Sequence, residues 1–203
     1  KEAVQNIASV IKKYAGKDLS DMDIHLQYVG TYVGVEGDSA SITMASVIIS
    51  AMEDIPMRQD LAMTGSLNVR GKVLPVGAVT AKLEAAARMG IGIALIPEAN
   101  AQDVMVAKKY FDTMDIYTVS NLRDVVEMAF VDSPGKTEYM EKLLPLSEDG
   151  GSGVKKVEAP VDFEVKQPVP ADRKREEPVE KAVEVEEEFI VTGVKPVADP
   201  RPQ

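Results

Sequence analysis

The chain has 203 residues, a net charge of -10, 45% hydrophobic and only 5% aromatic residues, one histidine, and neither cysteine nor tryptophan. This length fits one domain with appendages, whose core must be built from aliphatic and methionine side chains. The acidic charge argues against nucleic acid as a partner, because Lys and Arg drive binding to phosphate backbones. The absence of cysteine excludes disulfides, thiolate nucleophiles and cysteine-ligated metals, and one histidine cannot build a histidine-rich metal site.

No segment approaches the ~20 consecutive apolar residues of a transmembrane helix. The sequence does not begin with methionine, and Lys1 leads directly into a helical pattern rather than a signal peptide. We therefore expect a soluble piece of a longer protein.

The first third of the chain alternates helical and strand patterns. Apolar residues recur at helical spacing in residues 2–15, and Gly16 is a natural stop. Residues 23–30 predict a strand that leads into a glycine-rich connection. Residues 39–52 are small or apolar on every side, which predicts a buried helix.

The middle of the chain continues this alternation. The strand candidates are two within residues 60–77, joined by a turn at Arg70-Gly71, and one each at 91–97 and 115–119. The predicted helices are 78–90, which ends at Gly90, 101–111 and 121–130. This order predicts a mixed α/β (α+β) fold in which helices pack on small mixed sheets.

The composition changes after Leu146. Seven of the twelve prolines follow this residue, together with a GGSG segment and long charged runs. Such a segment buries too little apolar area to offset the entropy of ordering. We expect a domain over residues 1–146 and a flexible, acidic, proline-rich tail over 147–203, with 189–194 as a strand candidate within it.

Two glycine-containing segments, residues 34–41 and 150–156, are typical of loops. Neither has the G-x-x-x-x-G-K-[ST] spacing that surrounds a triphosphate. The chain therefore carries no ATPase of its own.

Ser39 stands at the start of the predicted buried helix. Backbone N–H groups and the positive end of the helix dipole at this position can stabilise an oxyanion beside a nucleophile. A commoner interpretation of the same pattern is that Ser39 or Asp38 is the helix N-cap. Ser39 would also need a base, because a serine alone is a poor nucleophile.

The sequence offers two candidate bases. His25 lies on a predicted strand, where a lone histidine is more often a packed residue than a catalyst. Lys82 lies on a predicted helix among alanine, valine and leucine, and desolvation can lower a lysine pKa from ~10.4 toward neutrality. A solvated lysine beside Glu84 is the commoner interpretation, and periodicity leaves both open.

Four blocks, in order and spacing, resemble the proteolytic domain of Lon proteases, and most closely the archaeal LonB-type branch. The blocks are DIHLQ (23–27), GVEGDSAS (34–41), AMTGSLNVRGKVLPVGAVTAKLEAA (62–86) and IALIPEAN (93–100). The resemblance covers about residues 2–132. The sequence departs from the family at Gly77-Ala78, where Gly-Gly is frequent. The family domain also begins with a strand segment before the first helix, and we expect that segment to be missing from this piece.

The resemblance assigns roles to individual residues. It implies that Ser39 is the nucleophile of a Ser-Lys dyad and Lys82 its base, with the Thr64 hydroxyl contacting the lysine. Asp38 and Glu36 are acidic residues of the nucleophile loop. A carboxylate paired with Lys82 would raise the lysine pKa, so that either could hold a resting state.

The resemblance also implies a serine endopeptidase that degrades unfolded or damaged proteins. It needs no cofactor or metal in this domain, whereas an AAA+ ATPase module of the same parent chain would use ATP and Mg²⁺. The family further implies a homo-hexamer and a cytoplasmic location, with the parent anchored to the membrane on its cytoplasmic side. Two alternatives are a catalytically silent Lon-like binding or assembly domain and a small-molecule esterase or amidase.

Overall fold

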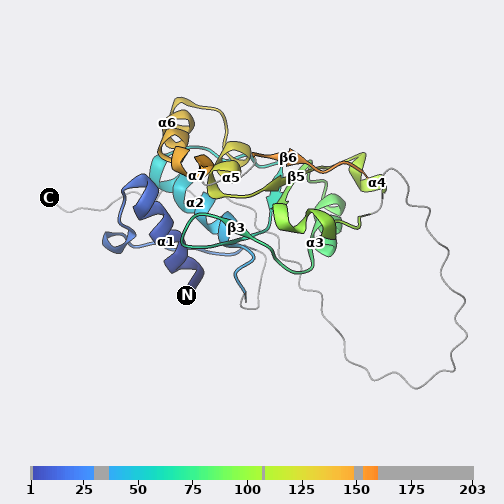
Figure 1. Cartoon of the computed structure of the whole chain (residues 1–203), viewed down its shortest axis with the longest axis horizontal. Helices are drawn as coiled ribbons and strands as arrows, with labels where there is room; N and C mark the ends of the chain where they lie inside the picture. Colours follow the sequence, from blue (N-terminus) through green and yellow to red (C-terminus); the bar gives the residue numbers. More distant parts are fainter. Residues whose placement is uncertain (1, 30–36, 107, 149–152, 160–203) are drawn as a thin grey trace, which may run out of the picture.

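In the computed structural model, helices lie on both faces of a small sheet (Figure 1). The structure describes residues 2–29, 37–106, 108–148 and 153–159. The helices are α1 (Glu2–Ala15), α2 (Ser41–Glu53), α3 (Val79–Arg88), α4 (Lys108–Phe111), α5 (Leu122–Ala129), α6 (Pro134–Lys142) and α7 (Leu144–Glu148), with 3₁₀ helices η1 (Leu19–Asp21) and η2 (Glu98–Asp103). Within these residues, no helix is long and apolar enough to span a bilayer.

The strands form a four-stranded sheet and a separate hairpin. The sheet contains β1 (Leu61–Met63), β4 (Ile93–Pro97), β5 (Asp115–Val119) and β6 (Lys155–Lys156) in the order β1-β4-β5-β6. The first three strands are parallel, and β6 is antiparallel to β5. The hairpin joins β2 (Ser66–Leu67) to β3 (Val73–Leu74). Its turn contains Gly71 at a φ of +79°, a conformation that glycine adopts without strain.

Strand alternation divides the core into two clusters, one on each face of the sheet. On β4, Leu95 contacts the cluster formed with α1, α2 and α5–α7, whereas Ala94 and Ile96 contact the cluster formed with α3. On β5, Val119 contacts the first of these clusters and Ile116 the second. Successive side chains of a strand point to opposite faces. The helices α2 and α3 are therefore held on opposite faces of one sheet.

The predicted mixed α/β architecture is confirmed, as are the helices near the N-terminus. The apolar face of α1 is buried through Ile7, Val10 and Ile11. Helix α2 buries residues around most of its circumference, as an apolar helix must. It begins at Ser41, two residues later than predicted. The segment predicted to hold two strands contains three, because β1 joins the main sheet before the hairpin begins.

The strand predicted over residues 23–30 is wrong for the part that the structure describes. Residues 23–28 have no regular secondary structure, and Ile24 and Leu26 are exposed. A strand needs a hydrogen-bonded neighbour along at least one edge. Residues 23–28 pair with no strand of the described chain. The alternating pattern alone therefore does not produce a strand here.

The single helix predicted over residues 101–111 is also wrong. The 3₁₀ helix η2 ends at Asp103, and the backbone of Val104 is extended. A separate helix, α4, follows. The Thr80 hydroxyl donates to the Asp103 carbonyl at 2.7 Å and accepts from the Met105 N–H at 3.2 Å. A side chain of α3 thus takes the backbone groups that a continuous helix would have used.

The C-terminal part is more ordered than the composition predicted. Helices α6 and α7 were not anticipated, and α7 continues past the expected boundary at residue 146. The strand β6 lies within the expected flexible tail and pairs with β5. The rest of that tail, including the strand candidate at 189–194, lies outside the described residues.

Helix α3 begins after a strained residue. Ala78 has a φ of 56° and a ψ of 31°, a left-handed conformation that costs an alanine about 1–2 kcal/mol. Glycine adopts it freely but loses about 0.5–1 kcal/mol more entropy on folding. Because Ala78 is exposed, Ala78→Gly should raise the free energy of unfolding by about 0.5–1 kcal/mol, measured by urea denaturation.

Ala81→Gly is the matched control, since Ala81 is an exposed residue inside the same helix. It should lower the unfolding free energy by about 1 kcal/mol. Destabilisation by both substitutions would show that the left-handed backbone at Ala78 is not strained.

Candidate active site

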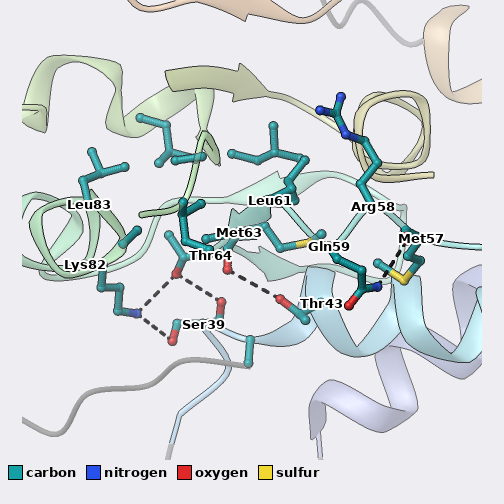
Figure 2. Close-up of a pocket in the computed structure, with 17 residues that line it drawn as sticks. Ser39, Thr43, Met57, Arg58, Gln59, Leu61, Met63, Thr64, Lys82 and Leu83 are labelled. Atoms are coloured by element: carbon teal, nitrogen blue, oxygen red, sulfur yellow. Dashed lines mark hydrogen bonds between the residues drawn. The ribbon is translucent and has the colours of Figure 1, made fainter. Parts of the chain in front are cut away.

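Ser39 lies in a turn just before α2. The N-cap of α2 is Ala40, and its side chain makes no capping hydrogen bond. The backbone N–H of Ser41 donates to the Asp38 carbonyl at 2.9 Å and closes the turn. The interpretation of Ser39 or Asp38 as the N-cap is therefore wrong. The turn leaves the Ser39 hydroxyl directed toward α3 (Figure 2).

Three consecutive residues after β1, Thr64, Gly65 and Ser66, hold this turn in place. The Gly65 N–H donates to the Ser39 carbonyl at 2.7 Å, and the Gly65 carbonyl accepts from the Ile42 N–H at 3.2 Å. A Cβ at Gly65 would lie 2.9 Å from Val73 Cγ1 and 3.0 Å from Ile42 Cδ1. Only glycine allows this approach without displacing its neighbours.

Lys82 reaches the turn from α3. Its Nζ donates to Ser39 Oγ at 2.9 Å and to Thr64 Oγ1 at 3.2 Å. The Thr64 hydroxyl donates in turn to the Ser39 carbonyl at 3.3 Å. Figure 2 shows the three side chains converging from α3, the end of β1 and the turn before α2. The sequence interpretation that places Lys82 beside Glu84 in solvent is wrong, because Lys82 is half-buried and Glu84 contacts Arg88 at 3.3 Å.

The loop that precedes α3 is held by a buried amide. Asn100 Oδ1 accepts from the Val76 N–H at 2.9 Å, and Asn100 Nδ2 donates to the Val76 carbonyl at 3.1 Å. Nδ2 also donates to Asp103 Oδ2 at 2.7 Å. The buried side chain of Asn100 thus fixes the approach to α3, and with it the position of Lys82.

A pocket lies beside Ser39 and Lys82. Its lining is mainly apolar and comes from β1, α3, β4, the segment before β1, and the start of α2 with the turn that precedes it. The apolar members are Ala40, Met57, Leu61, Ala62, Met63, Leu83, Ala86, Ile91, Ala94, Leu95 and Ile96. Arg58 also lines the pocket, and it donates to both carboxylate oxygens of Asp60 at 3.0 and 2.7 Å. This pairing lowers the pKa of Asp60 and raises that of Arg58.

The structure brings together Ser39, Lys82 and Thr64 among the residues singled out from the sequence. The Asp38 carboxylate accepts from the Ser66 hydroxyl at 2.5 Å. Glu36 lies outside the described residues. His25 is exposed and is not among the residues that line the pocket.

Three further residues, which the sequence did not single out, position the site: Gly65, Ser66 and Asn100. Gly65 and Ser66 belong to the longest block of the resemblance and Asn100 to the block at residues 93–100, and these blocks were the available signal. In the described part of the chain, no group of three or more His, Asp and Glu side chains is arranged to hold a metal ion.

A family model of the Lon protease (S16) C-terminal proteolytic domain matches residues 1–132. The chain belongs to this family. An archaeal Lon protease of Thermococcus kodakarensis is 51% identical over 149 residues, which cover 72% of this chain and 24% of that protein. An archaeal Lon protease of Methanothermobacter thermautotrophicus is 50% identical over 156 residues, which cover 77% of this chain and 24% of that protein.

The same name is carried by a more distant relative. An archaeal Lon protease of Methanocaldococcus jannaschii is 40% identical over 122 residues, covering 60% of this chain and 18% of that protein. These comparisons confirm the resemblance read from the sequence and identify the chain as a Lon-type proteolytic domain. The chain spans about a quarter of the length of the first two relatives.

Proposed function

We propose that this Lon-type domain is a serine endopeptidase in which Ser39 is the nucleophile and Lys82 the general base. The proposal is carried by the 2.9 Å contact between Lys82 Nζ and Ser39 Oγ at the edge of a pocket. A nucleophile and its base must lie within hydrogen-bond reach, and a third group commonly orients the base. Thr64, at 3.2 Å from Lys82 Nζ, suits that third position.

The first step is proton transfer and attack. Neutral Lys82 Nζ accepts the Ser39 hydroxyl proton while Oγ bonds to the carbonyl carbon of the scissile peptide. The mechanism requires a neutral amine, and the apolar lining around Lys82 supports this requirement because desolvation disfavours an ammonium. The carbonyl oxygen becomes an oxyanion that needs hydrogen-bond donors.

The most suitable donor is the backbone N–H of Ala40, the residue after the nucleophile. The Ser41 and Ile42 N–H groups already donate to the carbonyls of Asp38 and Gly65. Within the described chain, the Ala40 N–H has no acceptor, and Ala40 lines the pocket. A donor placed directly after the nucleophile also occurs in other serine hydrolases. We therefore assign the oxyanion to the Ala40 N–H rather than to the following turn of α2.

The remaining steps reuse the same base. The Lys82 ammonium transfers its proton to the leaving amine nitrogen as the peptide C–N bond breaks, which leaves an acyl ester on Ser39. Neutral Lys82 then takes a proton from water, whose oxygen attacks the ester carbon. The bond to Oγ breaks, and the ammonium returns a proton to Ser39.

The wider setting of this function rests on the family. We propose that the substrates are unfolded or damaged proteins and that an AAA+ module of the parent chain delivers them with ATP and Mg²⁺. We also propose that six parent chains form a ring in the cytoplasm, anchored to the membrane on its cytoplasmic side. The greater length of the relatives supports a larger parent.

Replacement of either dyad residue tests the assignment. Ser39→Ala and Lys82→Ala should each lower kcat/KM for a fluorogenic peptide by about a thousandfold or more, because each removes one half of the nucleophile–base pair. His25→Ala is the control and should retain activity. Circular dichroism should show an unchanged fold. Full activity in either dyad variant would exclude the Ser-Lys mechanism, and loss of activity in His25→Ala would favour a histidine base.

Thr64 is expected to act through orientation of Lys82. Thr64→Val keeps the shape of this buried side chain but removes the hydroxyl that contacts Lys82 and Ser39. It should lower kcat about 10–100-fold with little effect on KM. Thr64→Ser retains the hydroxyl and should stay within a few-fold of the original kcat. Full activity in Thr64→Val together with a loss in Thr64→Ser would indicate that packing of the methyl group, rather than the hydroxyl, is what matters.

A substrate panel separates the endopeptidase from the two alternatives. An endopeptidase should cleave an unfolded protein and internal bonds of peptides, and a fluorophosphonate probe should label Ser39 but not the Ser39→Ala variant. A silent binding domain would bind unfolded protein without cleavage or labelling. An esterase or amidase would hydrolyse small esters and leave peptides intact.

A further inference from the structure

Residues 153–159, which we call the C-terminal segment, lie along the edge of β5 that faces away from β4 (Figure 1). The Val157 N–H donates to the Ile116 carbonyl at 2.8 Å, and the Thr118 hydroxyl donates to the Lys155 carbonyl at 3.3 Å. The match to the Lon domain family ends well before this segment, so the family assigns it no role.

The two lysines of β6 make ion pairs with different parts of the fold. Lys155 Nζ donates to Glu98 Oε1 at 2.7 Å, and Lys156 Nζ lies 2.7 Å from Asp115 Oδ1. Both lysine side chains are more than half exposed, at 57% and 54%. Exposed ion pairs of this kind contribute little to overall stability. The two pairs therefore differ mainly in what they connect, because Asp115 belongs to the adjacent strand β5, whereas Glu98 is the first residue of η2.

Glu98 also binds the chain that follows β5. Its second carboxylate oxygen, Oε2, accepts from the Ser120 hydroxyl at 2.6 Å. Hydrogen bonds to an ionised acceptor are stronger than those between neutral groups. One carboxylate thus receives donors from β6 and from the end of β5, and both contacts fix the start of η2.

The 3₁₀ helix η2 in turn holds the start of α3. The Thr80 hydroxyl donates to the Asp103 carbonyl at 2.7 Å, and the Asn100 amide bonds to both backbone groups of Val76. Thr80 lies in the first turn of α3, two residues before Lys82. Because a short helix moves as a rigid element, a shift of η2 would carry Lys82 with it.

Val157 provides a second, apolar link to the same side of the sheet. Its half-buried side chain packs against the core cluster that contains Val79, Leu83 and Ala86 of α3. Polar and apolar contacts therefore both connect the C-terminal segment to the elements that position the proposed base.

We propose that the C-terminal segment is a clamp on η2 and α3, in which Lys155 is a positioning residue that acts through Glu98 to keep Lys82 in reach of Ser39. The inference rests on the proposed dyad function. Lys155 touches none of the reacting atoms, and its effect passes through η2. A displacement of about 1 Å between reacting groups can lower a rate about a hundredfold, so a small shift of α3 is enough to slow turnover.

A simpler role for β6 is to cover the edge of β5, since an uncovered strand edge tends to pair with other chains. That role does not distinguish the ion pair of Lys155 from that of Lys156. It also predicts association of the chains after loss of β6, without a specific effect on Lys82.

The two lysines give a matched test in the 203-residue chain. Lys155→Met and Lys156→Met each remove one exposed 2.7 Å ion pair and keep an apolar stem. Lys155→Met should lower kcat for a fluorogenic peptide about 3–10-fold with little change in KM, because α3 is less well positioned. Lys156→Met should retain the original kcat. Titration of Ser39 with a fluorophosphonate refers each kcat to the folded, reactive enzyme.

A proline substitution tests the backbone contact of the clamp. Val157→Pro removes the N–H that donates to Ile116 and should lower kcat about 10–100-fold. Glu158→Pro is the control and should keep the original kcat, because the Glu158 N–H donates to no backbone acceptor in the described chain.

Hydrogen exchange, followed by mass spectrometry, shows where the structure loosens. In Lys155→Met and Val157→Pro, exchange should rise in η2 and α3. It should not rise in α1, which packs in the other core cluster.

Equal losses of kcat in the two lysine variants would overturn the inference, as would an unchanged kcat in Lys155→Met or in a folded Val157→Pro protein. A rise in exchange that is equal in α1 and α3 would assign the segment to general stability and would also overturn it. If the original protein cleaves no peptide and Ser39 resists labelling, the proposed function fails, while the exchange of η2 and α3 still reports on the clamp.

Discussion

The contact between Lys82 Nζ and Ser39 Oγ joins two elements that lie on opposite faces of the sheet. The two residues belong to α3 and to the turn before α2, and these helices pack on opposite faces. They can meet only where the sheet ends. Because β1 stops at Met63, the chain that follows it passes between them, and Thr64 contacts both. The edge position of β1 in the order β1-β4-β5-β6 thus locates the site.

Buried polar groups gather around this crossing. Thr64, Ser66, Ser41 and Asn100 are all nearly inaccessible, and each hydrogen-bonds to a segment that carries or positions Ser39 or Lys82. In the larger core cluster, by contrast, α1, α2, α5 and α6 meet mainly through aliphatic side chains. An unsatisfied buried polar group costs more than a made hydrogen bond contributes. A small displacement of the turn that contains Ser39 would break several of these bonds together, so the geometry of the site is strongly specified.

The sequence predicted most of the fold for physical reasons that are local. Helix α1 has apolar residues at helical spacing, α2 and β4 are apolar throughout, and α3 has high helical propensity. Residues 23–28 have a strand pattern, yet they pair with none of the strands that the described chain contains. The predicted helix over 101–111 is interrupted by Thr80, a residue more than twenty positions earlier. Strand pairing and the hydrogen bonds of a distant side chain to the backbone depend on the tertiary structure. A local sequence pattern cannot predict them.

The site was less accessible to local reasoning than the fold. Ser39 and Lys82 are individually ordinary residues, and only the long blocks shared with a known family pointed to them. The contact between Ser66 and Asp38 joins residues 28 positions apart. Nothing in the sequence around either residue suggests it. Glycine at position 65 is explained only by the approach of Val73 and Ile42 from two other elements. These features depend on distances across the fold.

The two helices next to the site, α2 and α3, lack the side-chain caps that α5 and α6 have at their N-termini. Helices α5 and α6 begin with Asn121 and Ser133, whose side chains accept from backbone N–H groups of the first turn. Helices α2 and α3 begin with Ala40 and Ala78, which cannot cap. A side-chain cap adds about 1 kcal/mol to a helix, so its absence at both site helices has a cost in stability. The side chain of Asp38, which would otherwise be a natural cap, is bonded to Ser66 instead. The start of α2 therefore lacks a side-chain cap, and among the described residues it leaves the N–H of Ala40, which lines the pocket next to Ser39, without an acceptor.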